Sequence, residues 1–138
     1  MLQQASNEDT VMPLRSDVDV LKARKYGKEL AATLHFSTSE RTIIATAISE
    51  IARNTVLYAK SGSMHLKLIR NGIKRGLLIV AADEGPGIAD LKLAMQDGYT
   101  TSRGLGIGLP GAKRLMDEFD IVSEVGKGTV ITMKKWER

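Results

Sequence analysis

Glycine-rich loops are the first feature of this chain that could do chemistry. Nine of the 13 glycines fall between Gly85 and Gly128, in three loop clusters separated by regular structure. Such loops let backbone N–H groups approach a phosphate, and the start of a helix favours an anion. One cluster, TSRGLGIGLPG at residues 101–111, opens a helical stretch. The glycines therefore indicate a site for a phosphate-bearing ligand such as a nucleotide.

Two polar side chains lie one helical turn apart, upstream of these loops. Glu50 and Asn54 are four residues apart in a stretch whose apolar residues recur at helical spacing. At about 100° per residue, both side chains lie beside the apolar stripe rather than opposite it. The spacing therefore places a carboxylate and an amide at the margin of the core, where a cleft could reach them.

Two common nucleotide motifs are excluded by their context. Gly106–Gly111 has the G-x-G-x-x-G spacing of a dinucleotide-binding loop. However, residues 99–103 before it do not read as a buried strand, and only 27 residues follow it. The GKGT stretch at 126–129 lacks the glycine spacing and the Lys-Ser/Thr pair of a P-loop. A nucleotide site in this chain must be built in another way.

The first half of the chain predicts a strand followed by two helices. We expect a short edge strand at 11–16 and a helix from 17 to about 35. Ser37 and Glu40 form a capping box that begins a second helix, which runs to about residue 59. The buried stripe of this second helix is expected to be Ile44, Ile48, Ile51, Thr55 and Tyr58.

The second half predicts two pairs of strands with helices between them. We expect strands at 63–70 and 76–82, and the continuous apolar run of the latter is consistent with burial on both faces. A short helix at about 89–96 and a third long helix follow, before a hairpin of 121–124 and 129–136. The core face of the third helix is expected to be Leu109, Ala112, Leu115, Met116 and Phe119. This order of elements predicts an α+β domain.

Composition narrows the classes of function. With 138 residues, 43% of them hydrophobic, the chain is typical of one globular domain, and we expect residues 1–10 to be disordered and 11–138 to form it. The net charge of +4 is spread among acidic residues and aromatics make up only 4%, which argues against nucleic-acid binding. Cysteine is absent, and no membrane-length apolar run or signal pattern is present. We expect a cytoplasmic protein without disulfides.

Four short motifs resemble, in their order and distances, those of one nucleotide-binding family. They are Glu50-x-x-x-Asn54, Asp83-x-Gly85-x-Gly87, Gly104-x-Gly106-x-Gly108 and Gly128-Thr129. The set resembles the N box and G boxes of the GHKL ATPases, whose fold is shared by gyrase, Hsp90, MutL and histidine kinases. The resemblance implies a two-layer α/β sandwich of the Bergerat type, with a mixed sheet covered by helices on one face.

Longer stretches resemble one branch of this family. They are AISEIARN at 47–54, DEGPGI at 83–88 and GLGIGLPGAKRLMDEF at 104–119. These stretches are similar to the small anti-sigma-factor-type serine/threonine kinases, among them the switch kinases of stressosomes. The Leu-Pro-Gly after the glycines is more discriminating than the glycines themselves.

The resemblance implies roles for the two polar residues of the second helix. Asn54 would bind Mg²⁺ through its side-chain oxygen, a ligand that this ion accepts together with phosphate oxygens and water. Glu50 would be catalytic and would accept the proton of an attacking protein hydroxyl or of water. Each has a plainer alternative: Asn54 as a surface amide, and Glu50 as a solvated carboxylate that pairs with Arg53 or Asn54.

The resemblance also implies how adenine would be recognised. Asp83 would accept a hydrogen bond from the adenine amino group, with an ordinary turn residue as the alternative. Gly85 and Gly87 would let the backbone lie against the base. Thr129 would complete the contact, directly or through water, or would be an ordinary strand threonine.

The third motif would bind the phosphates at the start of the third helix. This cofactor-binding stretch is expected to comprise Gly104, Leu105, Gly106, Ile107 and Gly108. A lid over the ATP would include Thr101, Ser102 and Arg103. The arginine is the second expected catalytic residue, because it could reach the γ-phosphate, although it could equally face solvent.

By resemblance, the chain would be a protein serine/threonine kinase with ATP and Mg²⁺ as cofactors. Its substrates would be STAS-domain antagonist proteins, which would hold it in a stressosome-type complex. After release it would activate a PP2C-type phosphatase in a stress response; no nucleic-acid or membrane partner is implied. Two alternatives stay open: an anti-sigma factor kinase that sequesters a sigma factor, and a non-catalytic module that needs nucleotide to bind its partner.

Overall fold

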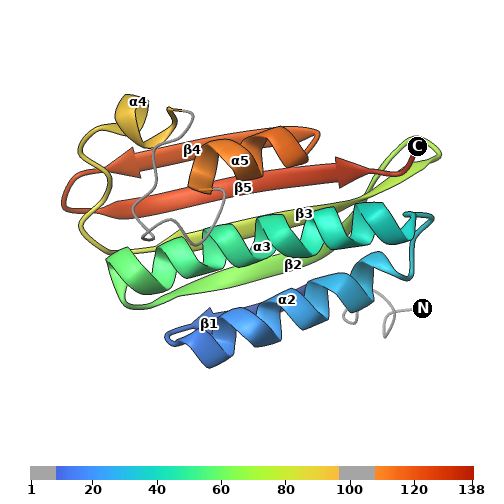
Figure 1. Cartoon of the computed structure of the whole chain (residues 1–138), viewed down its shortest axis with the longest axis horizontal. Helices are drawn as coiled ribbons and strands as arrows, with labels where there is room; N and C mark the ends of the chain where they lie inside the picture. Colours follow the sequence, from blue (N-terminus) through green and yellow to red (C-terminus); the bar gives the residue numbers. More distant parts are fainter. Residues whose placement is uncertain (1–8, 97–107) are drawn as a thin grey trace.

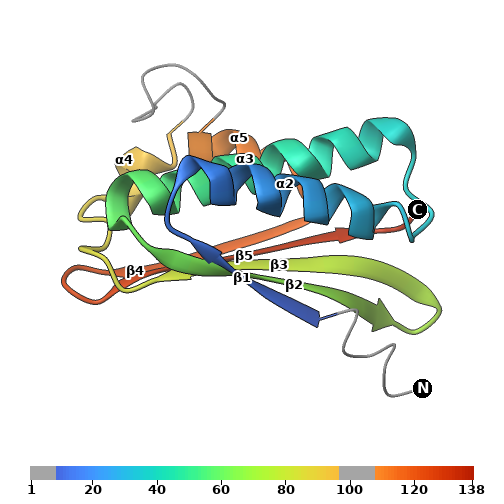
Figure 2. The same ribbon diagram turned by 90° about the horizontal axis from the view of Figure 1, so that it is seen from below.

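The fold is one β-sheet with helices on one of its faces. The computed structural model describes residues 9–96 and 108–138. Five strands pair in the order β1-β2-β3-β5-β4, and the helices lie together over one face of this sheet (Figure 1; Figure 2). The elements are β1 (Asp9–Leu14), α2 (Asp17–Ala31), α3 (Thr38–Ala59), β2 (Gly62–Asn71), β3 (Lys74–Asp83), α4 (Leu91–Ala94), α5 (Gly108–Leu115), β4 (Glu118–Glu124) and β5 (Gly128–Trp136). The expected α+β class and two-layer arrangement are confirmed.

The direction of the strands corrects one expectation. Each neighbouring pair among the described strands is antiparallel, so the sheet is not mixed. Two of these pairs, β2–β3 and β4–β5, are hairpins, and their short turns require the strands to run antiparallel. β5 lies between β3 and β4 and runs against both, so β3 and β4 share a direction without being neighbours.

Helix α3 is the element that carries the expected polar pair. The capping box is formed: Glu40 N–H donates to Ser37 Oγ at 3.1 Å, and Ser37 N–H donates to Glu40 Oε1 at 2.9 Å. The stripe that packs on the sheet is buried as predicted, except for Tyr58, which is 42% exposed because its ring lies at a cavity described below. Neither α3 nor any other described helix has the length and apolar character needed to cross a membrane.

The ends of two helices differ from the sequence expectation. α2 ends at Ala31, and turns then carry the chain to His35, while Leu34 remains buried. α5 ends at Leu115, so Phe119, expected on its core face, lies instead on β4. Apolar side chains can reach the core from turns and strands as well as from a helix, so their spacing did not locate these ends.

Strand β3 is central, as its apolar run predicts, but it is buried on one face only. The side chains that face the helices are 0–2% exposed: Leu77, Ile79 and Ala81. Those on the opposite face are half-buried: Leu78, Val80 and Ala82. The helices cover a single face of the sheet (Figure 2), so the run of apolar residues did not require a second covering layer.

The end of the chain is fastened to the sheet by one carboxylate. Glu137 accepts hydrogen bonds from the Arg75 guanidinium at 2.9 and 3.2 Å and from the His35 N–H at 2.6 Å. The hydrogen bonds from Arg75 and the His35 amide hold the pKa of Glu137 below its usual value. We call these three residues the C-terminal clasp. They lie at the opposite end of β3 and β5 from the Asp83–Thr129 pair.

Candidate functional site

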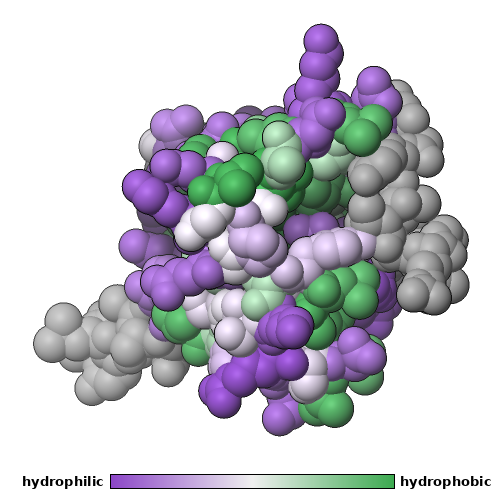
Figure 3. Space-filling view, turned by 90° about the vertical axis from the view of Figure 1, so that its left-hand side faces the viewer, coloured by the Kyte–Doolittle hydropathy of each residue, from purple (hydrophilic) through white to green (hydrophobic). Residues whose placement is uncertain are grey.

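A cavity of about 380 Å³ opens between α3, the loop after β3, α4 and the start of α5. This volume lies in the range of small-molecule sites. Figure 3 views this end of the molecule, where apolar side chains gather beside polar ones. The polar side chains that line the cavity are Glu50, Arg53, Asn54, Asp83, Asp90 and Thr129. The larger apolar ones are Leu57, Tyr58, Ile88, Leu93 and Leu109.

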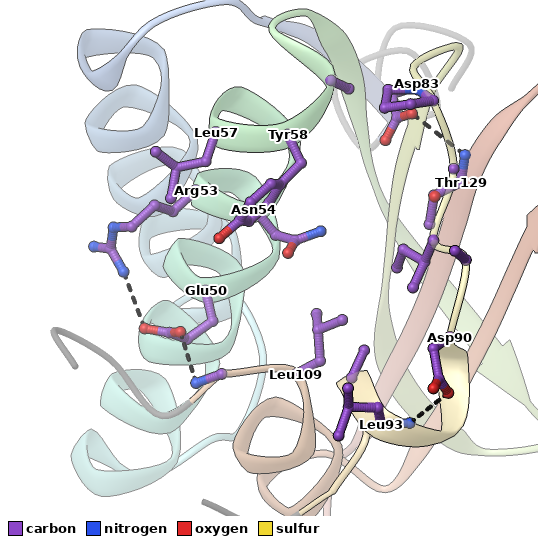
Figure 4. A pocket seen from close by; sticks show the side chains of 17 residues that line it. Glu50, Arg53, Asn54, Leu57, Tyr58, Asp83, Asp90, Leu93, Leu109 and Thr129 are labelled. Carbon is purple, nitrogen blue, oxygen red and sulfur yellow. Dashed lines mark hydrogen bonds and ion pairs between the residues drawn. The ribbon is translucent and has the colours of Figure 1, made fainter. Parts of the chain in front are cut away.

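Glu50 lies in the helix wall of the cavity with both carboxylate oxygens held. Oε1 accepts a hydrogen bond from the Gly108 N–H at 2.9 Å, and Oε2 accepts one from the Arg53 guanidinium at 3.0 Å (Figure 4). The side chain is 8% exposed. The plainer alternative, a glutamate paired with Arg53, is therefore present, but the carboxylate also lies in the cavity. Two partners on two oxygens give this carboxylate one orientation beside the start of α5.

Asn54 lies one turn further along α3 and its amide points into the same cavity (Figure 4). The four-residue spacing from Glu50 brings both side chains to one face of the helix, as the sequence predicts. Arg53 also lines the cavity, although it was expected only as an ion-pair partner of Glu50. Its distance of three residues from Glu50 is the signal that identifies it.

Asp83 and Thr129 form the sheet wall of the cavity, where they are opposite each other in the β3–β5 register. Asp83 Oδ1 accepts hydrogen bonds from the Gly85 N–H at 2.9 Å and the Thr129 N–H at 3.3 Å. Both of these bonds reach the same oxygen, so Oδ2 remains for a donor in the cavity. Asp83 is thus part of a turn and also a cavity residue.

Ser123 supports this wall and was not identified from the sequence. Its Oγ lies 2.7 Å from Thr129 Oγ1, 2.7 Å from the Ile88 nitrogen and 3.2 Å from the Gly128 carbonyl oxygen. Ser123 faces Thr129 across the β4–β5 register. The register of the closing hairpin places it there, but no local sequence pattern fixes that register.

Gly87 and Gly128 bring the loop after β3 against the β4–β5 turn. Their φ angles are +79° and +124°, a region that side chains disfavour. A Cβ on Gly128 would overlap the Asp83 carbonyl oxygen, and one on Gly87 would overlap the Glu124 carbonyl oxygen. These glycines let two backbones approach each other. That they and Gly85 let the backbone lie against a base stays a prediction.

The expected lid and most of the phosphate-binding stretch lie outside the described residues. They are Thr101, Ser102, Arg103, Gly104, Leu105, Gly106 and Ile107. Gly108 is described: it begins α5, lines the cavity and has a φ of +71°. The N–H that it directs to Glu50 is one of the amides expected to face phosphate.

The described residues fit an adenine nucleotide with a magnesium ion. The sheet wall offers the acceptor oxygens Asp83 Oδ2 and Thr129 Oγ1, apolar side chains flank them, and the opposite wall begins a helix. No group of three or more His, Cys, Asp or Glu among residues 9–96 and 108–138 could hold a metal. A magnesium ion would therefore depend on Asn54 with phosphate oxygens and water, which suits its preference for retaining water ligands.

Comparison of sequences identifies the family of this chain and several relatives. The family profile described as "Histidine kinase-like ATPase domain" matches residues 13–135. The chain is 46% identical over 132 residues to the serine/threonine-protein kinase RsbT of Bacillus subtilis, covering 96% of this chain and 99% of that protein. It is 34% identical over 120 residues to an anti-sigma F factor of a Thermoanaerobacter species, covering 83% and 82% of the two chains.

Comparison of structures supports the fold. The RsbU and RsbW domains of a Mycobacterium tuberculosis protein superpose with a TM-score of 0.59 at 18% identity, over 94% of this chain and 33% of that one. The mycobacterial sensor histidine kinase MprB gives a TM-score of 0.55 at 15% identity, over 94% of this chain and 99% of that one. At these identities the similarity concerns the fold.

Proposed function

The chain belongs to the family of histidine kinase-like ATPase domains, as a serine/threonine kinase, and on this premise we propose that it phosphorylates STAS-domain antagonist proteins with Mg-ATP. Once released from them, it activates a PP2C-type phosphatase in a cytoplasmic stress-signalling pathway that works by partner switching. The observation that carries the proposal is that Glu50 and Asn54 line one cavity with Asp83 and Thr129. The 46% identity to RsbT over nearly the whole chain supports it.

Four polar residues of the cavity have a defined role in this proposal. Asp83 Oδ2 and Thr129 Oγ1 receive the amino group of adenine at the sheet wall. Asn54 contributes its side-chain oxygen to the magnesium ion. When bound, ATP with Mg²⁺ supplies the phosphoryl group and the neutralising charge for its transfer. Glu50 accepts the proton of the serine or threonine hydroxyl of the substrate protein.

The arrangement around Glu50 supports its role as the base. The Arg53 guanidinium and the Gly108 N–H orient its carboxylate at 3.0 and 2.9 Å. Gly108 begins α5, where amides point outward from a helix start and favour an anion. The proton acceptor and the expected phosphate position are thereby neighbours, as transfer between a hydroxyl and a phosphate requires.

The test combines the chain with Mg-ATP and a cognate STAS-domain protein and measures phosphoserine and phosphothreonine by mass spectrometry. We expect transfer by the natural chain and its loss in Glu50→Gln and Asn54→Ala. Glu29→Gln is the matched control, because Glu29 is an exposed glutamate of α2 away from the cavity. Full activity of Glu50→Gln, or no transfer by a chain that binds ATP, would contradict the proposal.

Two alternatives are distinguished by partner binding. The identity to anti-sigma F factors favours sequestration of a sigma factor as the second candidate. Pull-down experiments with a sigma factor and with a PP2C-type phosphatase, each with and without the STAS-domain protein, would separate them. ATP binding without phosphotransfer to any candidate partner would instead indicate a non-catalytic module.

A further inference from the structure

The hydroxyl of Ser123 has three hydrogen-bonding neighbours, and two of them can act in one role only. A hydroxyl carries one proton to donate and two lone pairs to accept. The Ile88 N–H, 2.7 Å away, can only donate to Ser123 Oγ. The Gly128 carbonyl oxygen, 3.2 Å away, can only accept from it. When both bonds are made, the Ser123 proton is donated to Gly128 and one lone pair of Ser123 Oγ remains to accept another hydrogen bond.

All three contacts are hydrogen bonds at the same time only when the third neighbour, Thr129, is the donor. Thr129 Oγ1 lies 2.7 Å from Ser123 Oγ. When the Ser123 proton points to Gly128, the proton between the two hydroxyls belongs to Thr129. Thr129 is only 5% exposed and lines the cavity, so its lone pairs are what it offers to a ligand.

We propose that Ser123 is a specificity-determining residue that makes the sheet wall of the cavity an acceptor-only surface. With its proton committed to Ser123, Thr129 Oγ1 accepts but does not donate, and Asp83 Oδ2 beside it accepts as well. A purine with an amino group at this position satisfies both oxygens. A purine with a carbonyl there brings a third acceptor against these two oxygens, and only the N1–H on the neighbouring ring atom is left to donate. This inference rests on the nucleotide site of the proposed function.

Ser123 acts at a distance from the base, through another side chain. It is not among the cavity-lining residues, and its contacts are with Thr129 and with the backbone of the two segments that form the sheet wall. Its removal would free the Thr129 hydroxyl to rotate and donate into the cavity. The expected result is a change in which base is preferred, rather than a general loss of binding.

The experiment compares Mg-ADP with the magnesium complex of inosine diphosphate, which carries a carbonyl where adenine carries the amino group. Dissociation constants are measured by titration calorimetry, so no turnover is needed. We expect the natural chain to prefer ADP and Ser123→Ala to reduce that preference about tenfold, the effect of one hydrogen bond to a neutral group. Most of the change should come from tighter binding of inosine diphosphate.

A double-mutant cycle separates this role from a structural one. In the Thr129→Val background no hydroxyl remains for Ser123 to orient, so adding Ser123→Ala should leave the preference unchanged. Melting temperatures of the variants check that each is folded. An equal weakening of both nucleotides by Ser123→Ala, or a similar loss of preference in the Thr129→Val background, would overturn the inference.

The outcome also distinguishes the inference from the proposed function. If the natural chain binds ADP and Ser123→Ala leaves its preference unchanged, the inference fails and the nucleotide site stands. If the natural chain binds neither nucleotide, both fail.

Discussion

The two walls of the cavity hold their polar side chains in different ways. In the sheet wall, Asp83 and Thr129 sit opposite each other in the β3–β5 register, and backbone N–H groups fix the aspartate. In the helix wall, Glu50 is held by the Arg53 side chain and by the first amide of a separate helix, α5. The sheet wall is therefore fixed by backbone pairing. The helix wall is held by hydrogen bonds of the Glu50 side chain, which can be exchanged for others.

This difference supports the proposal that the two walls bind different parts of the nucleotide. Moving Asp83 relative to Thr129 would shift the β3–β5 pairing that ends at this pair, so the sheet wall is preorganised for a rigid ligand group. Glu50 can exchange the Gly108 amide for another partner without disturbing α3, which suits a group that must meet a reacting hydroxyl. Changes in the sheet wall should therefore affect affinity, and changes in the helix wall should affect rate.

The largest expected effect is on the helix wall. Glu50→Gln keeps the shape of the side chain but removes the proton acceptor, so phosphotransfer should fall by about 10²- to 10⁴-fold. The dissociation constant of ADP should change by less than about threefold, because we propose that the base binds at the other wall. Single-turnover phosphotransfer and calorimetry measure the two quantities. An equal loss of ADP affinity in Glu50→Gln would contradict the proposal that the two walls have separate roles.

The converse change is on the sheet wall. Asp83→Asn can keep the acceptor for the Gly85 and Thr129 amides but puts a donor where Oδ2 lies, facing the adenine amino group. We expect the affinity for ADP to fall about 100-fold, as for a buried hydrogen bond to a charged group replaced by a mismatch. Asp120→Asn, an exposed position of β4, is the control. If Asp83→Asn binds ADP with unchanged affinity, the adenine base does not bind at this wall.

A smaller effect is expected from the partner of Glu50. Arg53→Met removes the guanidinium at 3.0 Å but leaves the Gly108 N–H in place. The carboxylate then has one partner instead of two, and kcat should fall about tenfold while KM for ATP changes little. Arg24→Met, an exposed arginine of α2, should change neither value. A rise in KM alone would indicate that Arg53 contacts the nucleotide rather than orients Glu50.

The smallest effect on the cavity should come from the C-terminal clasp, which tests whether the walls depend on distant parts of the sheet. Glu137→Gln should lower the melting temperature but leave ADP affinity unchanged. The pKa of Glu137 is depressed in the folded chain, chiefly by the Arg75 hydrogen bonds. Its stabilisation is therefore complete above the ordinary glutamate range and is lost as the pH falls below about 4.

Melting curves between about pH 6 and pH 3 measure this contribution. The natural chain should lose stability more steeply on acidification than Glu137→Gln, because the variant has no carboxylate to protonate at this position. Identical slopes would show that the clasp does not contribute. A change in ADP affinity would show that the two ends of β3 and β5 are coupled.

Local sequence signals determined the elements that carry the site. The Ser37–Glu40 capping box and the apolar stripe after it specify α3, and the four-residue spacing of Glu50 and Asn54 follows from that helix. The apolar run before Asp83 specifies β3. Each of these signals depends on residues within one or two turns of each other, where chain connectivity limits the possible arrangements.

Only the tertiary structure decided which residues face one another across the cavity. The pairing of Asp83 with Thr129, the support of Thr129 by Ser123 and the contact of Gly108 with Glu50 join segments that are distant in sequence or set by strand register. The antiparallel sheet and its single covered face arise in the same way. If a strand shifts its pairing by one residue, every one of its side chains moves to the other face of the sheet. Local sequence patterns do not prevent such a shift, and only the packing of the strands against the helices does.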